Sequence, residues 1–494
     1  MHIDQSVTPL PIDLASAGVR DIAAGLRAGD FTSVQLTAAY LQRIAEISEG
    51  GPRLNSVRAI NDAALSDAAE RDAERASGFA DLGPLHGVPI LLKDNIDVAG
   101  MPTTGGSLAL ERSRPRADSP VAAALRRAGV VLLGKTNLTE FANYMTTGMA
   151  NGYSSLGGQV LNPYDASLTT SGSSAGSGSA AATALAAATV GTETFGSILS
   201  PALANSLVGV KPTVGLVSRT GIIPISGTQD TAGPMTRWVY DAAALLTAMT
   251  GIDPEDPATA ANPLVGTDFL AALSPTALSG ARLGFVADAG DEVYTRSLAL
   301  LQSRGATLVP VTVPESLTPR FLSFELRRDL NAYLARIHST PAVGAATDGQ
   351  ARTLAEIIDF NERHADVALK YGQKLLIESQ EIDLDDPGTA SHYAQVRATS
   401  VNESRTIVDR ILEENGIDAI VSNSTTVHLG ARACYPSVVV PAGYLSAGRK
   451  PAGLLFLGTA WSEAKLLALA YDFEQAAGAW RSPEEMNPSL FRRG

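Results

Sequence analysis

Two loops and one lysine hold the residue types that could do chemistry in this sequence. Ser197 lies in the run Gly-Thr-Glu-Thr-Phe-Gly-Ser-Ile-Leu-Ser-Pro-Ala over residues 191–202. Upstream, residues 171–178 form a Gly/Ser-rich segment, Ser-Gly-Ser-Ser-Ala-Gly-Ser-Gly, that contains Ser173. Still further upstream, Lys93 interrupts a short apolar run. A serine, a second serine and a lysine can form a hydrolytic centre that needs no histidine, provided that a base takes the proton of the attacking hydroxyl.

A flexible linker and a phosphate cradle are simpler interpretations of the Gly/Ser segment. Gly/Ser tracts are usually flexible, but this one is short and opens an alanine-rich stretch that we expect to be a helix. Backbone N–H groups at a helix N-terminus attract anions. However, the Gly-Lys-Ser/Thr ending of a Walker loop is absent from this segment. Both interpretations stay open as alternatives to the hydrolytic one.

A nucleophile elbow is a third alternative. Residues 172–176, Gly-Ser-Ser-Ala-Gly, match the pattern G-x-S-x-G, in which Ser174 would attack and a downstream histidine such as His428 would act as base. The elbow requires an apolar strand directly before the serine. Residues 162–171, Asn-Pro-Tyr-Asp-Ala-Ser-Leu-Thr-Thr-Ser, are instead typical of a loop, which disfavours this alternative.

The elements that must position these residues alternate between helices and short apolar strands. Two helices are expected within residues 13–49, where Thr32 and Gln35 make a capping-box pattern. One helical face there carries the apolar residues Leu36, Tyr40, Ile44 and Ile47. Further helices are expected over 61–75, 121–128, 178–188 and 239–249, and long helices up to about residue 415. Strands are expected at 88–92, 130–133, 208–213, 221–224, 282–286, 307–313, 417–421 and 436–441. This alternation predicts an α/β fold with a mixed sheet covered by helices.

Composition limits the classes of partner. The chain has 494 residues and a net charge of −13, which disfavours nucleic acid and anionic membranes because both reward basic surfaces. No apolar run approaches the ~20 residues needed to span a bilayer. Residues 1–6 lack the pattern of a signal peptide, so we expect a soluble, cytoplasmic protein, with a trimmed mature form left open. The single cysteine, Cys434, rules out an internal disulfide, and the six histidines are not at metal-ligand spacing.

Several segments, in order along the chain, carry a family pattern. They are His86-Gly-Val-Pro-Ile-Leu-Leu-Lys-Asp-Asn, Leu133-Gly-Lys-Thr-Asn-Leu-Thr-Glu-Phe, Gly157-Gly-Gln-Val-Leu-Asn-Pro, the Gly/Ser segment, the Ser197 loop, Gly209-Val-Lys-Pro-Thr-Val-Gly-Leu and Gln229-Asp-Thr-Ala-Gly-Pro-Met. With them the sequence resembles the amidase signature family of serine hydrolases. Dense matching covers about residues 84–235, and a weaker match covers 436–465. Residues 191–194, 215–226 and 458–465 make the chain most similar to the bacterial peptide amidases within that family.

The resemblance implies a fold and a triad. The fold is the amidase-signature fold, a large mixed twisted β-sheet covered on both faces by α-helices. The triad is of the Ser-cisSer-Lys type, with Ser197 as nucleophile, Ser173 as bridging serine and Lys93 as base. A lysine can serve as base only when it is neutral, and burial against residues 90–92 without a paired carboxylate would lower its pKa. Asp94 is adjacent in sequence but would point to the other face of a strand.

The resemblance also places an oxyanion hole and its supports. The backbone N–H groups of Thr194, Phe195, Gly196 and Ser197 would receive the oxyanion of the tetrahedral intermediate. Phe195 stands where the family usually has glycine or aspartate, and its ring either forms a wall of the substrate pocket or packs inward. Leu199 replaces a common arginine and Glu193 a commoner aspartate, so the ion pair usual there is not expected. Candidates for pocket or support are Ser174, Asn137, Asp230 and Trp461.

These residues predict an amidohydrolase without a cofactor or metal. The expected reaction cleaves a carboxamide C–N bond through an acyl-enzyme and releases ammonia from a primary amide, such as a peptide C-terminal amide. Alternatives are an aryl amidase or hydrazide hydrolase, an amidotransferase A-type subunit with partner proteins and a tRNA-bound substrate, the elbow esterase that uses Ser174, and a catalytically dead scaffold. The expected partner is a small-molecule or peptide amide, with no nucleic acid and no membrane, and the protein is expected to be a monomer or homodimer.

Residues 253–264 are proline-rich and make the best internal linker. Because strands are expected on both sides of it, we predict one amidase domain over 1–494. Its signature core is about 84–235, a variable substrate-shaping region is about 265–415, and a C-terminal core segment is about 416–494.

Overall fold

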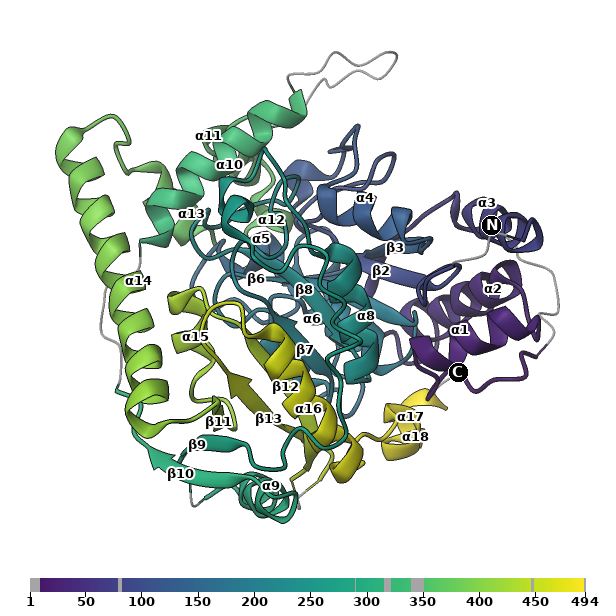
Figure 1. Ribbon diagram of the computed structural model, residues 1–494. Coiled ribbons are helices and arrows are strands. Elements are labelled where there is room, and N and C mark those ends of the chain that lie inside the picture. Colours follow the sequence, from purple (N-terminus) through teal and green to yellow (C-terminus); the bar gives the residue numbers. More distant parts are fainter. Residues whose placement is uncertain are drawn as a thin grey trace.

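One mixed sheet of 11 strands runs through the molecule. The computed structural model describes residues 9–78, 82–288, 290–314, 321–338, 351–445 and 448–492. The strand order is β1-β3-β2-β6-β8-β7-β12-β13-β11-β9-β10. β2 pairs in parallel with both β3 and β6, whereas β8 pairs antiparallel with β6 and β7. Helices surround this sheet (Figure 1), which confirms the predicted α/β architecture with a mixed sheet. The segment on which the signal-peptide expectation depends, residues 1–6, lies outside the described residues.

The elements have the following bounds. The strands are β1 (Val57–Ile60), β2 (Pro89–Lys93), β3 (Val131–Thr136), β4 (Tyr153–Ser154), β5 (Gly158–Gln159), β6 (Ala188–Glu193), β7 (Val208–Lys211), β8 (Thr231–Thr236), β9 (Arg282–Val286), β10 (Thr307–Val311), β11 (Ala419–Ser422), β12 (Ser437–Tyr444) and β13 (Pro451–Leu457). The helices before the middle of the chain are α1 (Val19–Ala28), α2 (Ser33–Arg43), α3 (Ala64–Ala76), α4 (Pro120–Arg127), α5 (Glu140–Asn143), α6 (Ala175–Ala182), α7 (Leu199–Ala204) and α8 (Val239–Met249). The later helices are α9 (Glu292–Ser303), α10 (Leu322–His338), α11 (Leu354–Arg363), α12 (Ala365–Ala368), α13 (Lys374–Gln380), α14 (Pro387–Asn415), α15 (Val427–Ala433), α16 (Glu463–Ala477), α17 (Pro483–Met486) and α18 (Pro488–Phe491).

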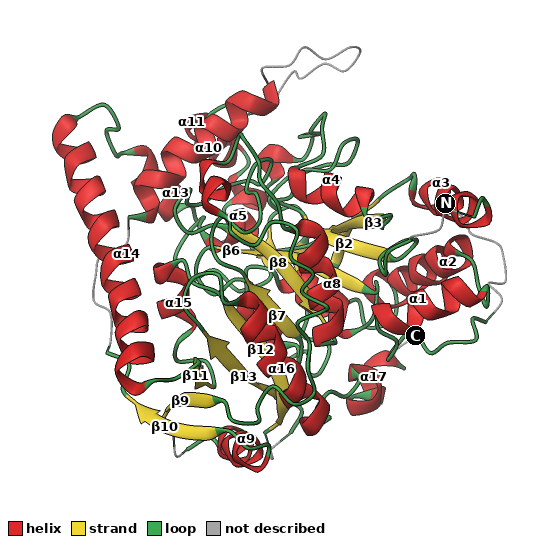
Figure 2. Ribbon diagram, in the orientation of Figure 1, coloured by secondary structure: helices red, strands yellow, loops and turns green. Residues whose placement is uncertain are grey.

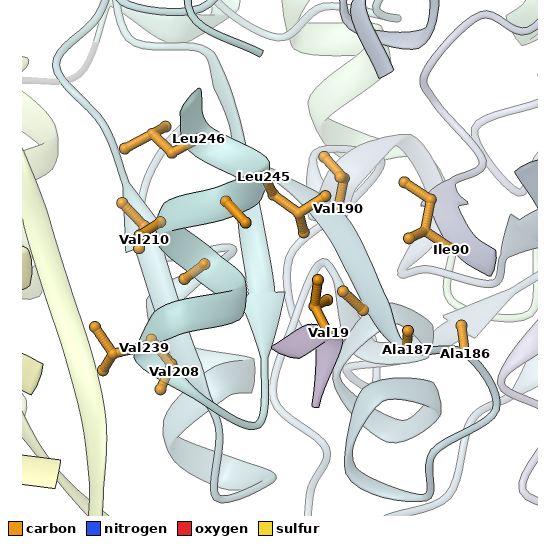
Figure 3. Packing of buried hydrophobic residues seen from close by; sticks show 14 of the residues in the cluster. Val19, Ile90, Ala186, Ala187, Val190, Val208, Val210, Val239, Leu245 and Leu246 are labelled. Atoms are coloured by element: carbon orange, nitrogen blue, oxygen red, sulfur yellow. The ribbon is translucent and has the colours of Figure 1, made fainter. Parts of the chain in front are cut away.

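The strands of the sheet are buried on both faces, so their sequences are apolar without interruption. In β12, Val438 and Val440 belong to one core cluster and Val439 belongs to another, as the two-residue period of a strand requires. On the first face, α8 packs its apolar side over β8 and β7, with Leu245 and Leu246 among the buried residues (Figure 3). The second face is covered by residues of α7, α14 and α15.

A third cluster forms beside the sheet, in the middle of the chain. Apolar residues of α10, α11 and α13 pack there against Met145 and Ile225. Figure 2 shows these helices gathered at one end of the molecule, with the long helix α14 running along its side. This helical group corresponds to most of the region that we predicted to be variable.

The structure differs from the expected elements at three places. The helix that starts in the Gly/Ser segment ends at Ala182, because the chain turns over residues 183–187, with Ala184 at a positive φ of 50°, before β6 begins at Ala188. Residues 221–224 do not form a strand, since only Ile222 makes an isolated bridge, to Ile96. The proline-rich segment 253–264, which we interpreted as a linker, contains a short 3-10 helix at Pro257–Ala261, and its residues Asp256, Thr259 and Asn262 are buried.

The N-terminal helices follow their sequence signals. Thr32 Oγ1 accepts a hydrogen bond from the backbone N–H of Gln35, and the Gln35 side chain accepts one from the N–H of Thr32, which completes the predicted capping box. Leu36 and Tyr40 are fully buried. A single π-helical turn, Ile44–Glu49, extends α2, so the second predicted helix continues to the expected end.

Candidate active site

Lys93 is the last residue of β2, and its side chain is fully buried. Its Nζ lies 2.7 Å from Ser173 Oγ, 3.0 Å from Ser174 Oγ and 2.9 Å from Thr192 Oγ1. Thr192 is near the end of β6, the parallel neighbour of β2. Because parallel strands end at the same edge of a sheet, β2 and β6 bring the lysine and the threonine together there.

Burial lowers the pKa of Lys93 to about 7, because the charged ammonium loses its hydration, and the charges of Asp230 and Glu193 offset only part of this effect. Among the described residues, no carboxylate forms an ion pair with Lys93. As predicted, Asp94 points elsewhere: it forms ion pairs with Arg58 and, at 3.6 Å, with Lys135. Lys93 can therefore exist as a neutral amine near pH 7.

The Gly/Ser segment forms a turn that leads into α6, and its Gly172–Ser173 peptide bond is cis. Gly176 is required by this packing, since a Cβ there would lie 2.2 Å from the carbonyl oxygen of Asn137. Ser174 is fully buried, and its hydroxyl donates to the carbonyl of Thr192 at 3.0 Å while accepting from the Thr192 N–H at 3.2 Å. Ser174 thus joins the turn to β6.

Ser197 follows β6 in a tight loop and keeps 8% of its surface exposed. The backbone N–H of Ser174 donates to the carbonyl of Ser197 at 3.2 Å, so the two serine loops are in direct contact. Glu193 Oε2 accepts from the N–H groups of Ile198 and Leu199, at 2.8 and 3.0 Å, and so fixes the backbone after Ser197.

Gly196 gives the Ser197 loop its shape. Its φ of +88° lies in the left-handed region, and a Cβ would lie 3.1 Å from Val427 Cγ1. Because a side chain is excluded there, α15 can pack directly against the loop. The loop backbone next to Ser197 therefore keeps a conformation that only glycine adopts without strain.

Asp230 and Gln229 hold the other side of the loop through Thr194. Thr194 Oγ1 donates to Asp230 Oδ1 at 2.5 Å, and Gln229 Nε2 donates to the carbonyl of Thr194 at 3.0 Å. Asp230 Oδ2 accepts from the N–H groups of Ile225 and Ser226, both at 2.8 Å. Burial raises the pKa of Asp230 to about 7, against the lowering effect of these hydrogen bonds. Asp230 is thus a support of the loop.

A cavity of about 320 Å³ lies next to this cluster, although Lys93, Ser173 and Ser197 themselves are not among its lining residues. Its lining includes Thr192, Thr194 and Asp230, and an apolar wall formed by residues 222–225. Tyr333 of α10 also lines the cavity and donates to Asp97 at 2.8 Å, so the helical group of the middle region borders it. The cavity is large enough for a small organic substrate.

Glu325 of α10 anchors the loop that holds Thr194. Its side chain is fully buried and accepts hydrogen bonds from Ser226 Oγ, from Thr228 Oγ1 at 2.6 Å and from Tyr393 OH at 2.5 Å. Tyr393 lies on α14, so this one carboxylate links two helices of the middle region to residues 226–230.

Replacing Glu325 by alanine is expected to lower the free energy of unfolding by roughly 3 kcal/mol, because several buried donors lose their acceptor. Denaturant titration of Glu325→Ala measures this loss. Glu362→Ala, at an exposed position on α11, is the matched control. Equal unfolding free energies of the two variants would contradict the anchoring role.

The remaining predicted site residues lie in different places. Asn137 is fully buried and bonds to Gly157 and Ser154, so it supports a turn rather than the cavity lining. Trp461 lines a separate cavity. The Phe195 ring stacks on His428 of α15 with centroids 4.0 Å apart, and it is not among the lining residues of the cavity at Thr194. Phe195 is half-buried, with its ring against His428, so the choice between a pocket wall and inward packing stays a prediction.

The elbow alternative does not fit these contacts. The Ser174 hydroxyl is enclosed by Thr192 and Lys93, and residues 162–171 form no strand before it. His428 faces Phe195 instead.

Three residues that support the site were not predicted from the sequence. Two of them, Thr192 and Gln229, lie inside the matched motifs, and this membership was a signal that could have pointed to them. Glu325 lies far from any motif, and the contacts that give it a role involve residues about a hundred positions away.

Comparison with known proteins is consistent with this geometry. Residues 35–429 match the family model described as Amidase. A probable amidase of Arabidopsis thaliana is 36% identical over 95% of this chain and 92% of its own length. The A-type component of the glutamyl-tRNA(Gln) amidotransferase of Thermobifida fusca is 34% identical, over 84% of this chain and 82% of its own. The crystal structure of the peptide amidase of Stenotrophomonas maltophilia superposes with a TM-score of 0.88 at 42% identity, covering 96% of this chain and 99% of that one.

In the part of the chain that the structure describes, no helix is long and apolar enough to cross a membrane. The same part contains no group of three or more His, Cys, Asp and Glu residues arranged to hold a metal ion. The matched family model, the shared fold and the similarity over nearly the full chain agree: the chain belongs to the amidase family and is an amidohydrolase with the amidase signature.

Proposed function

We propose that this amidase releases ammonia from a primary carboxamide, such as the C-terminal amide of a peptide, through a Ser197–Ser173–Lys93 triad. The observation that carries the triad is the 2.7 Å contact between Lys93 Nζ and Ser173 Oγ, made by a buried lysine whose pKa is about 7. A second support is the direct backbone contact between the two serine loops.

The proposed reaction runs in two halves. Neutral Lys93 takes the proton of Ser173 while Ser173 takes that of Ser197, and Ser197 Oγ attacks the carbonyl carbon. The N–H groups of residues 194–197 stabilise the oxyanion. The same proton relay then runs in reverse to the leaving nitrogen, the C–N bond breaks, and ammonia departs. Water, deprotonated by the relay, attacks the acyl-enzyme and frees the acid and Ser197.

The substrate class draws support from the 42% identity with a peptide amidase over nearly both full chains. An aryl amide or a hydrazide would undergo the same chemistry. Because this chain is similar to an amidotransferase component, glutamine is a further candidate substrate, as an ammonia donor. The choice among these substrate classes is tested by measuring ammonia released from peptide amides and glutamine, and arylamine or hydrazine released from the other two classes. Inactivity on every peptide amide would remove our first choice.

A cytoplasmic location and a monomeric or homodimeric state stay predictions.

The activity should depend on pH through Lys93. Below its pKa of about 7 the lysine is charged and cannot take a proton, so kcat/KM is expected to rise with pH through a midpoint near 7. The Asp230 carboxylate raises the pKa of Lys93, so Asp230→Asn should move this midpoint to lower pH. Initial rates at low substrate concentration, from pH 5 to 9, measure both curves. A profile that is flat or falls across pH 7 would contradict lysine as the base.

A further inference from the structure

A second cavity, of about 610 Å³, shares the lining residues Arg219 and Gly227 with the cavity at Thr194 and is lined by arginines. Arg219, Arg397 and Arg405 contribute to its lining, and none of its lining residues is aspartate or glutamate. This is unexpected in a chain with 51 acidic and 38 basic residues. We call this cavity the arginine groove.

The three guanidinium groups differ in how far they are neutralised. Arg219 forms an ion pair and further hydrogen bonds with Asp256. Arg397 donates to Thr228 Oγ1 at 2.6 Å and lies 3.8 Å from Glu325. Arg405 donates from Nε to the carbonyl of Ala433 at 3.0 Å and lies over the Tyr435 ring.

Within the described ranges, no carboxylate lies within 4.0 Å of the Arg405 guanidinium nitrogens. The nearby Asp409 carboxylate accepts hydrogen bonds from Tyr435 OH at 2.6 Å and from Thr459 Oγ1 at 2.8 Å. Arg405 therefore presents an unneutralised charge to the groove, and a guanidinium suits a carboxylate ligand in particular.

Two segments connect the groove to the loop of residues 194–197. On one side, Phe195 stacks on α15, and the residues that directly follow this helix, Cys434 and Tyr435, line the groove. On the other side, Gln229 holds Thr194, and the preceding Gly227 and Thr228 line the groove. The thiol of Cys434 donates to the carbonyl of Thr228 at 3.3 Å, which joins these two walls.

We propose that the arginine groove is an anion subsite that binds a carboxylate carried by the acyl part of the amide substrate. This rests on the proposed function: when ammonia leaves a peptide amide, the whole peptide is the acyl part and must extend away from Ser197. Acidic side chains of that peptide would then reach Arg405 and Arg397, and the enzyme would prefer acidic peptide amides.

The test uses N-acetylated peptide amides with glutamate one or two residues before the amidated residue, each against its glutamine counterpart. The ratio of kcat/KM for the glutamate and glutamine peptides is expected to be about 10 in the wild type, since a charge-assisted contact gives this order of discrimination. Arg405→Gln should bring the ratio close to 1, and Arg405→Lys should keep part of it. Raising the salt concentration should lower the wild-type ratio, because the groove is open to solvent.

Arg410→Gln is the matched control, because Arg410 lies on the same helix α14, pairs with Glu414 and is not among the lining residues. A wild-type ratio of 1 at both glutamate positions, or equal ratios in Arg405→Gln and Arg410→Gln, would overturn the subsite.

Calorimetric binding of the same peptides to Ser197→Ala separates the two proposals. If the wild type releases no ammonia from any of the peptides, the proposed substrate class is wrong. The subsite is then decided by binding alone: it is supported if Ser197→Ala binds the glutamate peptide more tightly and Arg405→Gln removes that difference, and overturned if both peptides bind equally or neither binds.

Discussion

Ser197→Ala is expected to lower kcat for carboxamide hydrolysis by roughly 10⁵–10⁶-fold, the effect found when a serine nucleophile that acts as a unit with its base is removed. KM should stay nearly unchanged, because the hydroxyl contributes little to substrate binding. The folded state should also be unaffected, since Ser197 keeps part of its surface exposed and its carbonyl still accepts from Ser174. Single-turnover ammonia release with the purified variant measures the effect.

Ser200→Ala provides the comparison for this loss, because Ser200 lies on α7, just after the same loop. It should retain kcat within the same order of magnitude as the wild type. Comparable losses in the two variants would indicate damage to the loop and would remove Ser197 as nucleophile.

Lys93→Met is expected to lower kcat by roughly 10³-fold, the range that a positioned general base contributes. Methionine has nearly the length of lysine and suits a fully buried site, so the variant should fold. Without the amine, neither Ser173 nor Ser197 can pass on its proton. The pH dependence near 7 should disappear together with the activity, and a pH–rate profile of the residual turnover checks this.

Lys135→Met separates loss of the base from loss of any buried lysine. Lys135 is also fully buried, on the neighbouring strand β3, but it donates to Thr103 and pairs with Asp94 rather than with the serines. Its replacement should lower thermal stability more than kcat. If Lys135→Met lost as much kcat as Lys93→Met while remaining folded, the role of Lys93 would be no more than structural.

The parts of this site that could be predicted from sequence are those with local signals. Lys93 breaks an apolar run, so the same residues that predict a buried strand predict a lysine that loses its hydration. The Gly/Ser segment predicts the start of a helix, and α6 begins there. The order of the motifs gave the family, and with it the mixed sheet that brings β2 beside β6.

The parts that could not be predicted depend on contacts between distant segments. Nothing near Glu325 in the sequence indicates that it anchors residues 226–228, because that contact exists only once α10 has packed beside the sheet. The stacking of the Phe195 ring on His428 could not be predicted either, because α15 lies more than two hundred residues later in the sequence. The end of α6 at Ala182 was also missed, because an alanine-rich run favours a helix. In the structure the chain instead turns after Ala182 and enters β6 at Ala188.

The most direct test of the central claim is to label the enzyme with a fluorophosphonate and identify the modified residue by peptide mass spectrometry. Such reagents form an adduct with an activated serine hydroxyl. One adduct is expected, on Ser197, formed at a much lower rate in Lys93→Met and at an unchanged rate in His428→Ala. An adduct on Ser174 that is lost in His428→Ala and retained in Lys93→Met would contradict Ser197 as the nucleophile and support the elbow alternative.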